Sequence, residues 1–366
     1  MALRPVDPGR VRCVNLLRMS ITSLCARYGR RVACVVTLAA SALAASPLRA
    51  QDGNAGVPEL RLSTALAPTY PLGRAGQRWA QLVNEKAGST FEVRQYPGAT
   101  LAARDPGREF GALKSGLAEL SVGSALAWSS QFAPVGVYVI PWLTGSAREQ
   151  EALAADASLR ESVFAQMSAA GVIGLAVAPL GEHVLATARV PIETPADLNG
   201  LRVRVVSLRS LVEVYVALGA VPQSMNFVQA QAALAAGTLE AQDALPTTLV
   251  ATRASVSGVK FITRWGAFAD VMLFAVHKAS WDAWTEERRA LVRSAAEQAA
   301  REANALAREE AALAQLTKDG VTIVRLSPAQ RNALRDAAQS AINAWTELVG
   351  ADLAGAARAV VAAARK

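Results

Sequence analysis

The stretch LKSGLAELSVGSA, residues 113–125, indicates how the chain is organised, because its residue pattern recurs further along the sequence. LAAGTLEAQDALP, residues 234–246, has the same order of helix end, glycine, hydrophobic–acid pair and strand. In both copies the glutamate, Glu119 or Glu240, lies three residues after the glycine. One explanation is chance similarity between two segments of a sequence that is rich in alanine and leucine. The other is two lobes built on one plan, each presenting strand ends to a common cleft, where ligands of α/β sheets bind.

Strands and helices alternate around the first copy. Residues 59–66 (ELRLSTAL) and 91–96 (FEVRQY) have the character of strands, and residues 71–88 have the apolar spacing of a helix that ends at Gly88. GVIGLAVAPL at 171–180 predicts a buried strand. This alternation indicates an α/β lobe with a largely parallel sheet.

A second lobe is expected to begin near residue 181. TPADLNG at 194–200 predicts a short helix with Thr194 as its N-cap, and LRVRV at 201–205 then alternates as a strand. The expected boundaries are 51–180 plus about 254–281 for lobe I and 181–253 plus part of 321–366 for lobe II.

The last third of the sequence is expected to be mostly helical. Thr285 can cap a helix that runs to about Lys318, and about 50 Å of helix is long enough to connect both lobes. We therefore expect a lobe-spanning helix over about 285–320. A coiled coil is the alternative, but the apolar residues keep no strict heptad. SPAQ at 327–330 has the pattern of a capping box and predicts a helix that ends at Gly350.

The net charge of +8 comes almost entirely from residues 1–50, which hold eight arginines and one acid. The remaining chain is nearly neutral, with 30 basic and 29 acidic side chains. It has no basic stripe with interleaved aromatic residues, so a nucleic-acid partner is not expected.

Residues 1–50 have the anatomy of an export signal. An arginine cluster at 27–31 precedes the apolar run VACVVTLAASALAA at 32–45, and small residues then allow a cut near Ala50. The run is shorter than the ~20 residues that span a bilayer. Translation from Met19 would give a signal of more usual length. We expect the mature chain in the periplasm.

All three cysteines (13, 25 and 34) lie in this leader, so the mature chain has neither a disulfide nor a thiolate site. A twin-arginine signal at 30–31 and a lipoprotein signal at Cys34 are alternatives that the flanking residues fit poorly. The two histidines, His183 and His277, have no metal-binding spacing. We therefore expect no metal and no cofactor.

Motifs of catalysis are missing from the sequence. It has no dinucleotide fingerprint, P-loop, nucleophile elbow or zinc-protease helix, and an S-x-x-K pattern at 257–260 lacks its usual partners. A binding protein is therefore favoured over an enzyme. Arg204 is the first candidate contact, because a guanidinium fork matches a carboxylate. His183 is a second candidate, and Trp128 and Trp265 are candidates for an aromatic wall.

From about Glu59 onward the chain resembles the solute-binding proteins of tripartite ATP-independent periplasmic (TRAP) transporters, DctP type. The matching stretches are TALAPTYPLGRAGQRWAQLVNEKAG, VRQYPGATL, REFGALKSGLAELSVGSA, VYVIPWL, TPADLNGLRVRV, ALGAVPQSMNF, ALAAGTLEAQDAL and FAVHKASWDAWTEERRALVRSAA. The resemblance implies an α/β, two-lobed periplasmic binding protein (type II-like). It also implies a monomeric receptor that captures an organic acid and hands it to membrane permease subunits.

The resemblance implies that Arg204 binds the ligand carboxylate. It also draws attention to Gln242, Asp243 and Phe227 as ligand contacts, while Arg202 is expected at the surface. A receptor that feeds a sensor, or an exported enzyme on the same scaffold, remains an alternative.

The sequence departs from the family pattern in the expected pocket. Val206 stands where relatives usually have proline, and His183 stands where many have a second arginine. Ala244 and Leu245 replace an asparagine–proline pair. We therefore expect a monocarboxylate with an apolar or aromatic body rather than a dicarboxylate.

Overall fold

The computed structural model describes residues 57–366 except 207, 226 and 304, and it does not describe the side chains of 227–228 and 305–307. The predicted export signal and its cut near Ala50 lie outside the described residues. Over the part of the chain that is described, no helix combines the length and the apolar character that a membrane span requires.

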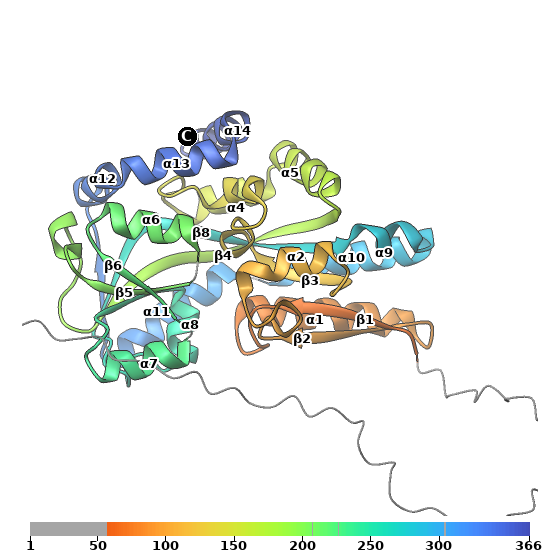
Figure 1. Ribbon diagram of the computed structural model, residues 1–366, viewed down its shortest axis with the longest axis horizontal. Helices are drawn as coiled ribbons and strands as arrows, with labels where there is room; N and C mark the ends of the chain where they lie inside the picture. The colour runs from red at the N-terminus through yellow and green to blue at the C-terminus, as the bar shows by residue number, and fades with distance from the viewer. Residues whose placement is uncertain (1–56, 207, 226, 304) are drawn as a thin grey trace, which may run out of the picture. The chain divides into compact units, whose positions relative to one another are not determined.

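The nine strands found in residues 57–366 form one sheet (Figure 1). In sheet order they are β2 (Glu92–Pro97), β1 (Glu59–Thr64), β3 (Leu120–Ser124), β8 (Phe261–His277), β4 (Val172–Thr187), β7 (Ala241–Ala244), β5 (Arg202–Val205) and β6 (Val221–Ser224), with β9 (Thr322–Arg325) beside β8. β1 is parallel to β2 and β3, and β5 is parallel to β6 and β7. The repeat seen in the sequence is therefore a repeat of topology.

The same contacts among an arginine, a glycine and a glutamate hold both copies of the repeat in place. In lobe I the guanidinium of Arg61 donates to the Gly116 carbonyl (2.8 Å) and forms an ion pair with Glu119 at 2.7 Å. In lobe II the guanidinium of Arg202 donates to the Gly237 carbonyl (3.2 Å) and forms an ion pair with Glu240 at 3.3 Å. Each glutamate also accepts the backbone N–H of its arginine. Arg202 is thus a half-exposed structural residue.

Helices cover both faces of the sheet. They are α1 (Pro71–Ala87), α2 (Glu109–Lys114), α3 (Ala125–Trp128), α4 (Ala147–Ala155), α5 (Ala157–Ala169), α6 (Arg209–Ala217), α7 (Phe227–Ala235), α8 (Pro246–Ala251), α9 (Lys278–Ala283), α10 (Glu286–Glu302), α11 (Ala305–Lys318), α12 (Pro328–Ala337), α13 (Gln339–Val349) and α14 (Ala351–Ala364). Short 3-10 turns are η1 (Thr100–Ala102), η2 (Pro106–Arg108), η3 (Ala133–Val139) and η4 (Pro195–Leu198). Figure 1 shows α12–α14 running across one side, with α13 packed on α6 and α14 on α4.

The predicted helix starts are present. Thr285 accepts the N–H of Arg288 at the start of α10, and Ser327 and Gln330 form a capping box before α12. Thr194 and Asp197 form a capping box as well, although the turn that follows is a 3-10 turn. These caps begin their elements because they satisfy backbone N–H groups that no preceding turn can accept.

The predicted lobe-spanning helix over 285–320 is described as two helices, on either side of residue 304, which lies outside the described residues. α10 ends at Glu302 and packs on α1 in lobe I, whereas α11 begins at Ala305 and packs on α8 and β9 in lobe II. The helix predicted to run from Pro328 to Gly350 is divided between α12 and α13. Alanine-rich sequence keeps the helical spacing across the division at Ala338, so periodicity did not reveal it.

The predicted lobe boundaries also need a correction, because β4 and β8 cross from one lobe to the other. The first part of β8, Phe261–Arg264, pairs with β9, and Ile262 packs in the lobe II core. The last part of β8, Met272–Val276, pairs with β3 in lobe I. β4 crosses in the same way and pairs with β7 only over Val184–Thr187. Residues 254–281 are therefore divided between the lobes.

Over the described residues, the core consists of three large apolar clusters and a small one of Ala99, Ala102 and Ala112. One lies in lobe I around Leu62, Trp79 and Phe274, and a smaller one lies in lobe II around Leu234 and Ile262. The largest covers the opposite face of the sheet under the C-terminal helices, and it includes residues of both lobes. This common layer joins the lobes on one side and leaves the other side for a cleft.

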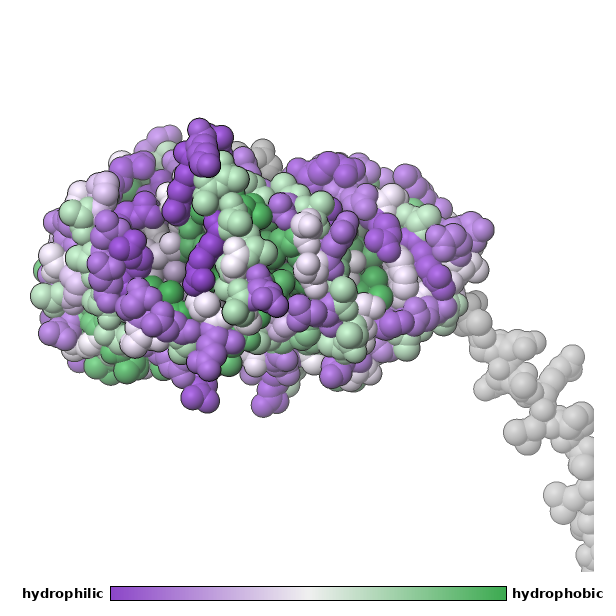
Figure 2. Space-filling model, turned by 90° about the horizontal axis from the view of Figure 1, so that it is seen from above, coloured by the Kyte–Doolittle hydropathy of each residue, from purple (hydrophilic) through white to green (hydrophobic). Residues whose placement is uncertain are grey.

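On the face seen in Figure 2, hydrophilic residues predominate, with apolar residues between them. The large hydrophobic side chains that are exposed within the described ranges are Val57, Leu117, Val190, Val216, Val221, Val256 and Leu348. Individual exposed hydrophobic residues are normal on a protein surface.

Candidate functional site

A cavity of about 510 Å³ lies between the two lobes. Its wall includes Ser124 at the end of β3, Ser224 at the end of β6 and Ala244 at the end of β7. Ala65 and Val206, which directly follow β1 and β5, also line it. The carboxyl ends of the parallel strands of both lobes therefore meet at this cavity, the position where α/β sheets bind ligands.

Arg204 supplies a fixed positive charge on the lobe II side. Its side chain is only 3% exposed, and its guanidinium donates to the carbonyls of Met225 (2.9 Å) and Asp243 (3.3 Å). Burial lowers the pKa of Arg204 to about 10, against the attraction of Asp243 and Tyr215. The group stays protonated at neutral pH, and its hydrogen bonds to backbone hold its orientation. It is suited to bind an anion such as a carboxylate.

His183 lies on β4, the strand that crosses between the lobes, and its ring is oriented by Asp243 of lobe II. Its Nδ1 lies 2.5 Å from an oxygen of Asp243, and the other oxygen of that carboxylate accepts the Tyr215 hydroxyl at 2.7 Å. Since Asp243 is an acceptor, Nδ1 carries the proton. Burial lowers the pKa of His183, but the charge of Asp243, the hydrogen bond to it and the charge of Asp270 raise that pKa more, so the net shift is upward.

Asp270 is a cavity residue that the sequence did not reveal. It is 1% exposed, and its carboxylate accepts the hydroxyl of Ser124 and the backbone N–H groups of Leu126 and Val271. Burial raises the pKa of Asp270, while His183 and these hydrogen bonds lower it less. A signal was present, since Asp270 is the single acid in the seventeen residues of β8.

The predicted site residues divide into two groups. Arg204, His183 and Asp243 line the cavity, and so do the other departures from the family pattern, at 206, 244 and 245. Gln242 and the two tryptophans do not line it. The side chain of Phe227 lies outside what the structure describes.

Strand alternation and core packing explain why the other predicted site residues do not line the cavity. Gln242 is fully buried beside Asp243, on a strand that is covered on both faces. Trp265 packs on Tyr215, with ring centroids 5.4 Å apart, and so supports the residue that holds Asp243. Trp128 lies in the core against Phe110. Among the side chains that the structure describes, none lining the cavity belongs to phenylalanine, tyrosine or tryptophan.

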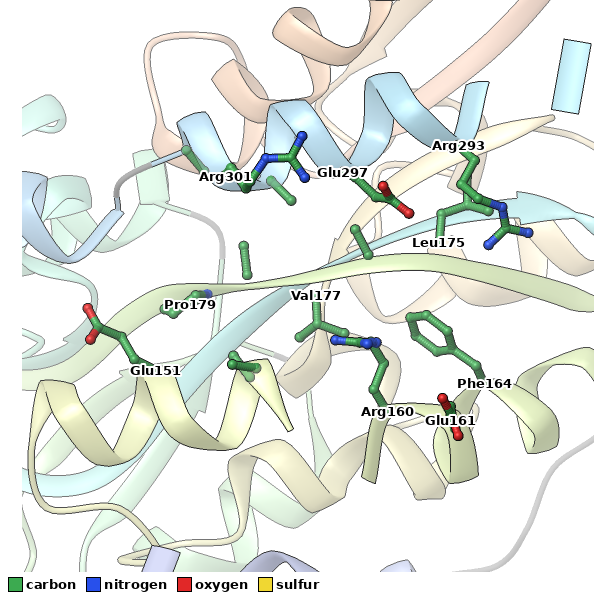
Figure 3. Close-up of a pocket in the computed structure, with 16 residues that line it drawn as sticks. Glu151, Arg160, Glu161, Phe164, Leu175, Val177, Pro179, Arg293, Glu297 and Arg301 are labelled. Atoms are coloured by element: carbon green, nitrogen blue, oxygen red, sulfur yellow. The ribbon is translucent and has the colours of Figure 1, made fainter. Parts of the chain in front are cut away.

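A larger groove of about 740 Å³ lies elsewhere, over β4 between α5 and α10 (Figure 3). Its long side chains include Glu161 on α5 and Arg293, Glu297 and Arg301 on α10, all exposed. Mixed charges on flexible, hydrated side chains do not fix a ligand, so we regard the interlobe cavity as the functional site.

A family model described as bacterial extracellular solute-binding protein, family 7 (DctP), matches residues 62–347. The chain belongs to this family, and it is a solute-binding protein of the TRAP type. It is 25% identical over 314 residues to the C4-dicarboxylate-binding periplasmic protein DctP of Rhodobacter capsulatus, covering 83% of this chain and 91% of that protein.

Solved structures agree with this fold. A TRAP periplasmic solute-binding protein from Ralstonia eutropha H16, with bound (S)-2-hydroxy-2-methyl-3-oxobutanoate, is 32% identical with a TM-score of 0.79, and the match covers 83% of this chain and 98% of that one. A TRAP periplasmic solute-binding protein from Shewanella oneidensis, with bound succinate, is 20% identical with a TM-score of 0.74, over 83% of this chain and 99% of that one. The predicted two-lobed, type II-like α/β fold is therefore confirmed.

Proposed function

We propose that this protein is an extracytoplasmic receptor that binds an organic acid between its lobes, with the carboxylate on Arg204, and delivers it to TRAP permease subunits. The observation that carries this proposal is the buried guanidinium of Arg204 on the cavity wall, oriented by two backbone carbonyls. A charge-assisted pair of this kind in a partly desolvated site contributes about 2–3 kcal/mol.

The proposed ligand class is a monocarboxylate with an apolar body. Aliphatic side chains form much of the wall, among them Leu66, Leu72, Leu126, Leu180, Leu208 and Met225. The carboxylates of Asp243 and Asp270 lie on the same wall and oppose a second negative charge on the ligand. The ligand of the Ralstonia relative is itself a monocarboxylate. The name of the Rhodobacter relative makes a dicarboxylate the competing class.

The remaining parts of the proposal follow from the family and from the leader. We propose export by residues 1–50 with a cut near Ala50, residence in the periplasm, and action as a monomeric receptor without catalysis. Delivery to a sensor instead of a permease is the second candidate, and genes for permease subunits beside this one would favour transport.

The anchor is tested by measuring the affinity of monocarboxylates and dicarboxylates of equal length for the purified protein and for Arg204→Ala. Loss of this pair is expected to weaken the best monocarboxylate by about 2–3 kcal/mol, and a saturating ligand should raise the melting temperature of the unaltered protein by several degrees. Arg202→Ala is the matched control, since Arg202 lies two residues away and pairs with Glu240; it should bind normally.

Two results would contradict the proposal. Unchanged affinity in Arg204→Ala would move the carboxylate anchor to another residue. Tighter binding of succinate than of every monocarboxylate would replace the proposed ligand class by the dicarboxylates.

A further inference from the structure

Two groups from different strands face each other on the wall of the cavity without a hydrogen bond between them. The Nε2 atom of His183 lies 4.0 Å from the Oδ2 atom of Asp270. That separation is too long for a hydrogen bond. Nδ1 is engaged by Asp243, so Nε2 is the ring nitrogen that remains for a ligand.

Both groups are held before any ligand arrives. Asp243 fixes the imidazole from lobe II and is itself fixed by the Tyr215 hydroxyl. Ser124 and the N–H of Leu126 fix the Asp270 carboxylate from lobe I. A rigid pair of this kind costs little conformational entropy on binding, and therefore gives discrimination between ligands.

The 4.0 Å gap fits one chemical group better than its alternatives. A hydroxyl oxygen about 2.8 Å from both atoms can accept the Nε2–H of a charged His183 and donate its own hydrogen to Asp270. A keto oxygen has no hydrogen to donate, so it would leave the Asp270 oxygen facing another acceptor. A carboxylate would also add a negative charge beside Asp243 and Asp270, which is unfavourable in a desolvated site.

We propose that the ligand is a hydroxy monocarboxylate whose hydroxyl bridges His183 Nε2 and Asp270 Oδ2, and that Asp270 determines this specificity. The inference rests on the proposed function, because it assumes that Arg204 holds the carboxylate. The charged groups around the bridge are Arg204, Asp243, His183 and Asp270, with Arg104 and Asp105 also lining the cavity.

The test compares ligands that share one carbon skeleton. Isothermal titration measures the affinities of isovalerate, α-hydroxyisovalerate, β-hydroxyisovalerate and methylsuccinate for the unaltered protein. One hydroxy acid is expected to bind roughly tenfold to a hundredfold tighter than isovalerate, as for a hydrogen bond to a charged group. Methylsuccinate should bind more weakly than that hydroxy acid.

Asp270→Asn then tests the residue itself. The backbone N–H groups of Leu126 and Val271 hold the Asn oxygen, so the NH₂ faces His183 and the ligand hydroxyl loses its acceptor. The preference for the hydroxy acid over isovalerate should fall to roughly threefold or less. Asp156→Asn is the matched control, because this aspartate caps α5 at a half-exposed position outside the cavity, and it should keep the full preference.

Each result bears on a different claim. Equal binding of the hydroxy acids and isovalerate would overturn the inference and leave the proposed function intact, and it requires no variant to fold. Binding of none of the monocarboxylates would overturn the proposed function, and the inference with it. A full hydroxy preference in folded Asp270→Asn would remove Asp270 from the assignment.

Discussion

The half-sheets β2-β1-β3 and β6-β5-β7 share one frame but carry different chemistry at their carboxyl ends. In register, Leu62 pairs with Leu120 in lobe I as Val203 pairs with Ala241 in lobe II. The position of Arg204 in lobe II therefore corresponds to Ser63 in lobe I. Likewise, the position of Asp243 corresponds to Val122. The frame is common to both lobes, while the cation at this position, Arg204, belongs to lobe II.

Lobe I has a buried neutral pair where lobe II has its cation. Ser63 donates its hydroxyl to Glu109 at 2.7 Å, and Glu109 is fully buried. Burial raises the pKa of Glu109 to about 8, against the hydrogen bond from Ser63. Glu109 is therefore protonated at neutral pH. At this position of the shared frame, lobe I therefore has a neutral hydrogen-bonded pair, and lobe II has the anchor for a charged ligand.

The largest expected effect comes from breaking the frame at equivalent core positions. Leu62→Ala and Val203→Ala each remove a fully buried side chain from the central strand of a half-sheet. We expect a loss of about 3 kcal/mol for Leu62→Ala and about 2 kcal/mol for Val203→Ala. Denaturant unfolding measures both. A much smaller loss in one lobe would show that its half-sheet is not held as rigidly as the other.

A pH series tests the contrast between the neutral Ser63–Glu109 pair of lobe I and the charged Arg204 of lobe II. The pKa of Glu109 is raised to about 8 from 4.5, so the folded state binds the proton more tightly than the unfolded state. Its stabilising contribution is complete below pH 4.5 and is lost as the pH rises to about 8. Glu109→Gln should remove this loss, so its stability relative to the unaltered protein should rise by about 4 kcal/mol between pH 4.5 and pH 8.

Melting temperatures of both proteins at several pH values test this prediction. Glu309 has a pKa raised to about 7 by burial and contributes in the same direction to both proteins, so only their difference is attributed to Glu109. Parallel pH profiles would mean that Glu109 is charged in the folded protein.

The smallest expected effect concerns the two arginine–glutamate pairs. Glu119→Gln should cost about 1 kcal/mol and Glu240→Gln about half as much, since the second pair is longer and more exposed. Glu85→Gln, in an exposed pair at 3.6 Å, is the control and should cost almost nothing. Thermal or chemical unfolding measures all three. Equal costs for the three variants would remove the structural role of the repeated pairs.

Local pattern predicted the repeat but not the partners that complete it. Glycine and glutamate lie three residues apart, so the motif is visible in the sequence, whereas Arg61 is 58 residues from Glu119 and Arg202 is 38 from Glu240. The caps at Thr285 and Ser327 were predictable for the same local reason.

From residue type alone, Arg204 was the strongest candidate for a site residue. Arg204 stands out because a cation within an apolar strand needs an explanation. Gln242 and Asp243 are neighbours on one strand and both are buried, so a prediction of burial could not identify the one that faces the cavity. Trp265 and Asp270 both lie on β8, whose pairing with β4 has several register shifts, and alternation counted from either end of such a strand fails to place its side chains.

The crossing of β4 and β8 also sets the order in which the protein can be completed during synthesis. Lobe I cannot close its sheet until the last residues of β8, near 277, have emerged, and lobe II still needs β9 at 322–325. Pairings this distant in sequence form late, because the loops that they close are long. A nascent chain with this topology keeps both half-sheets incomplete until most of the chain has been synthesised, which suits the proposed export before folding.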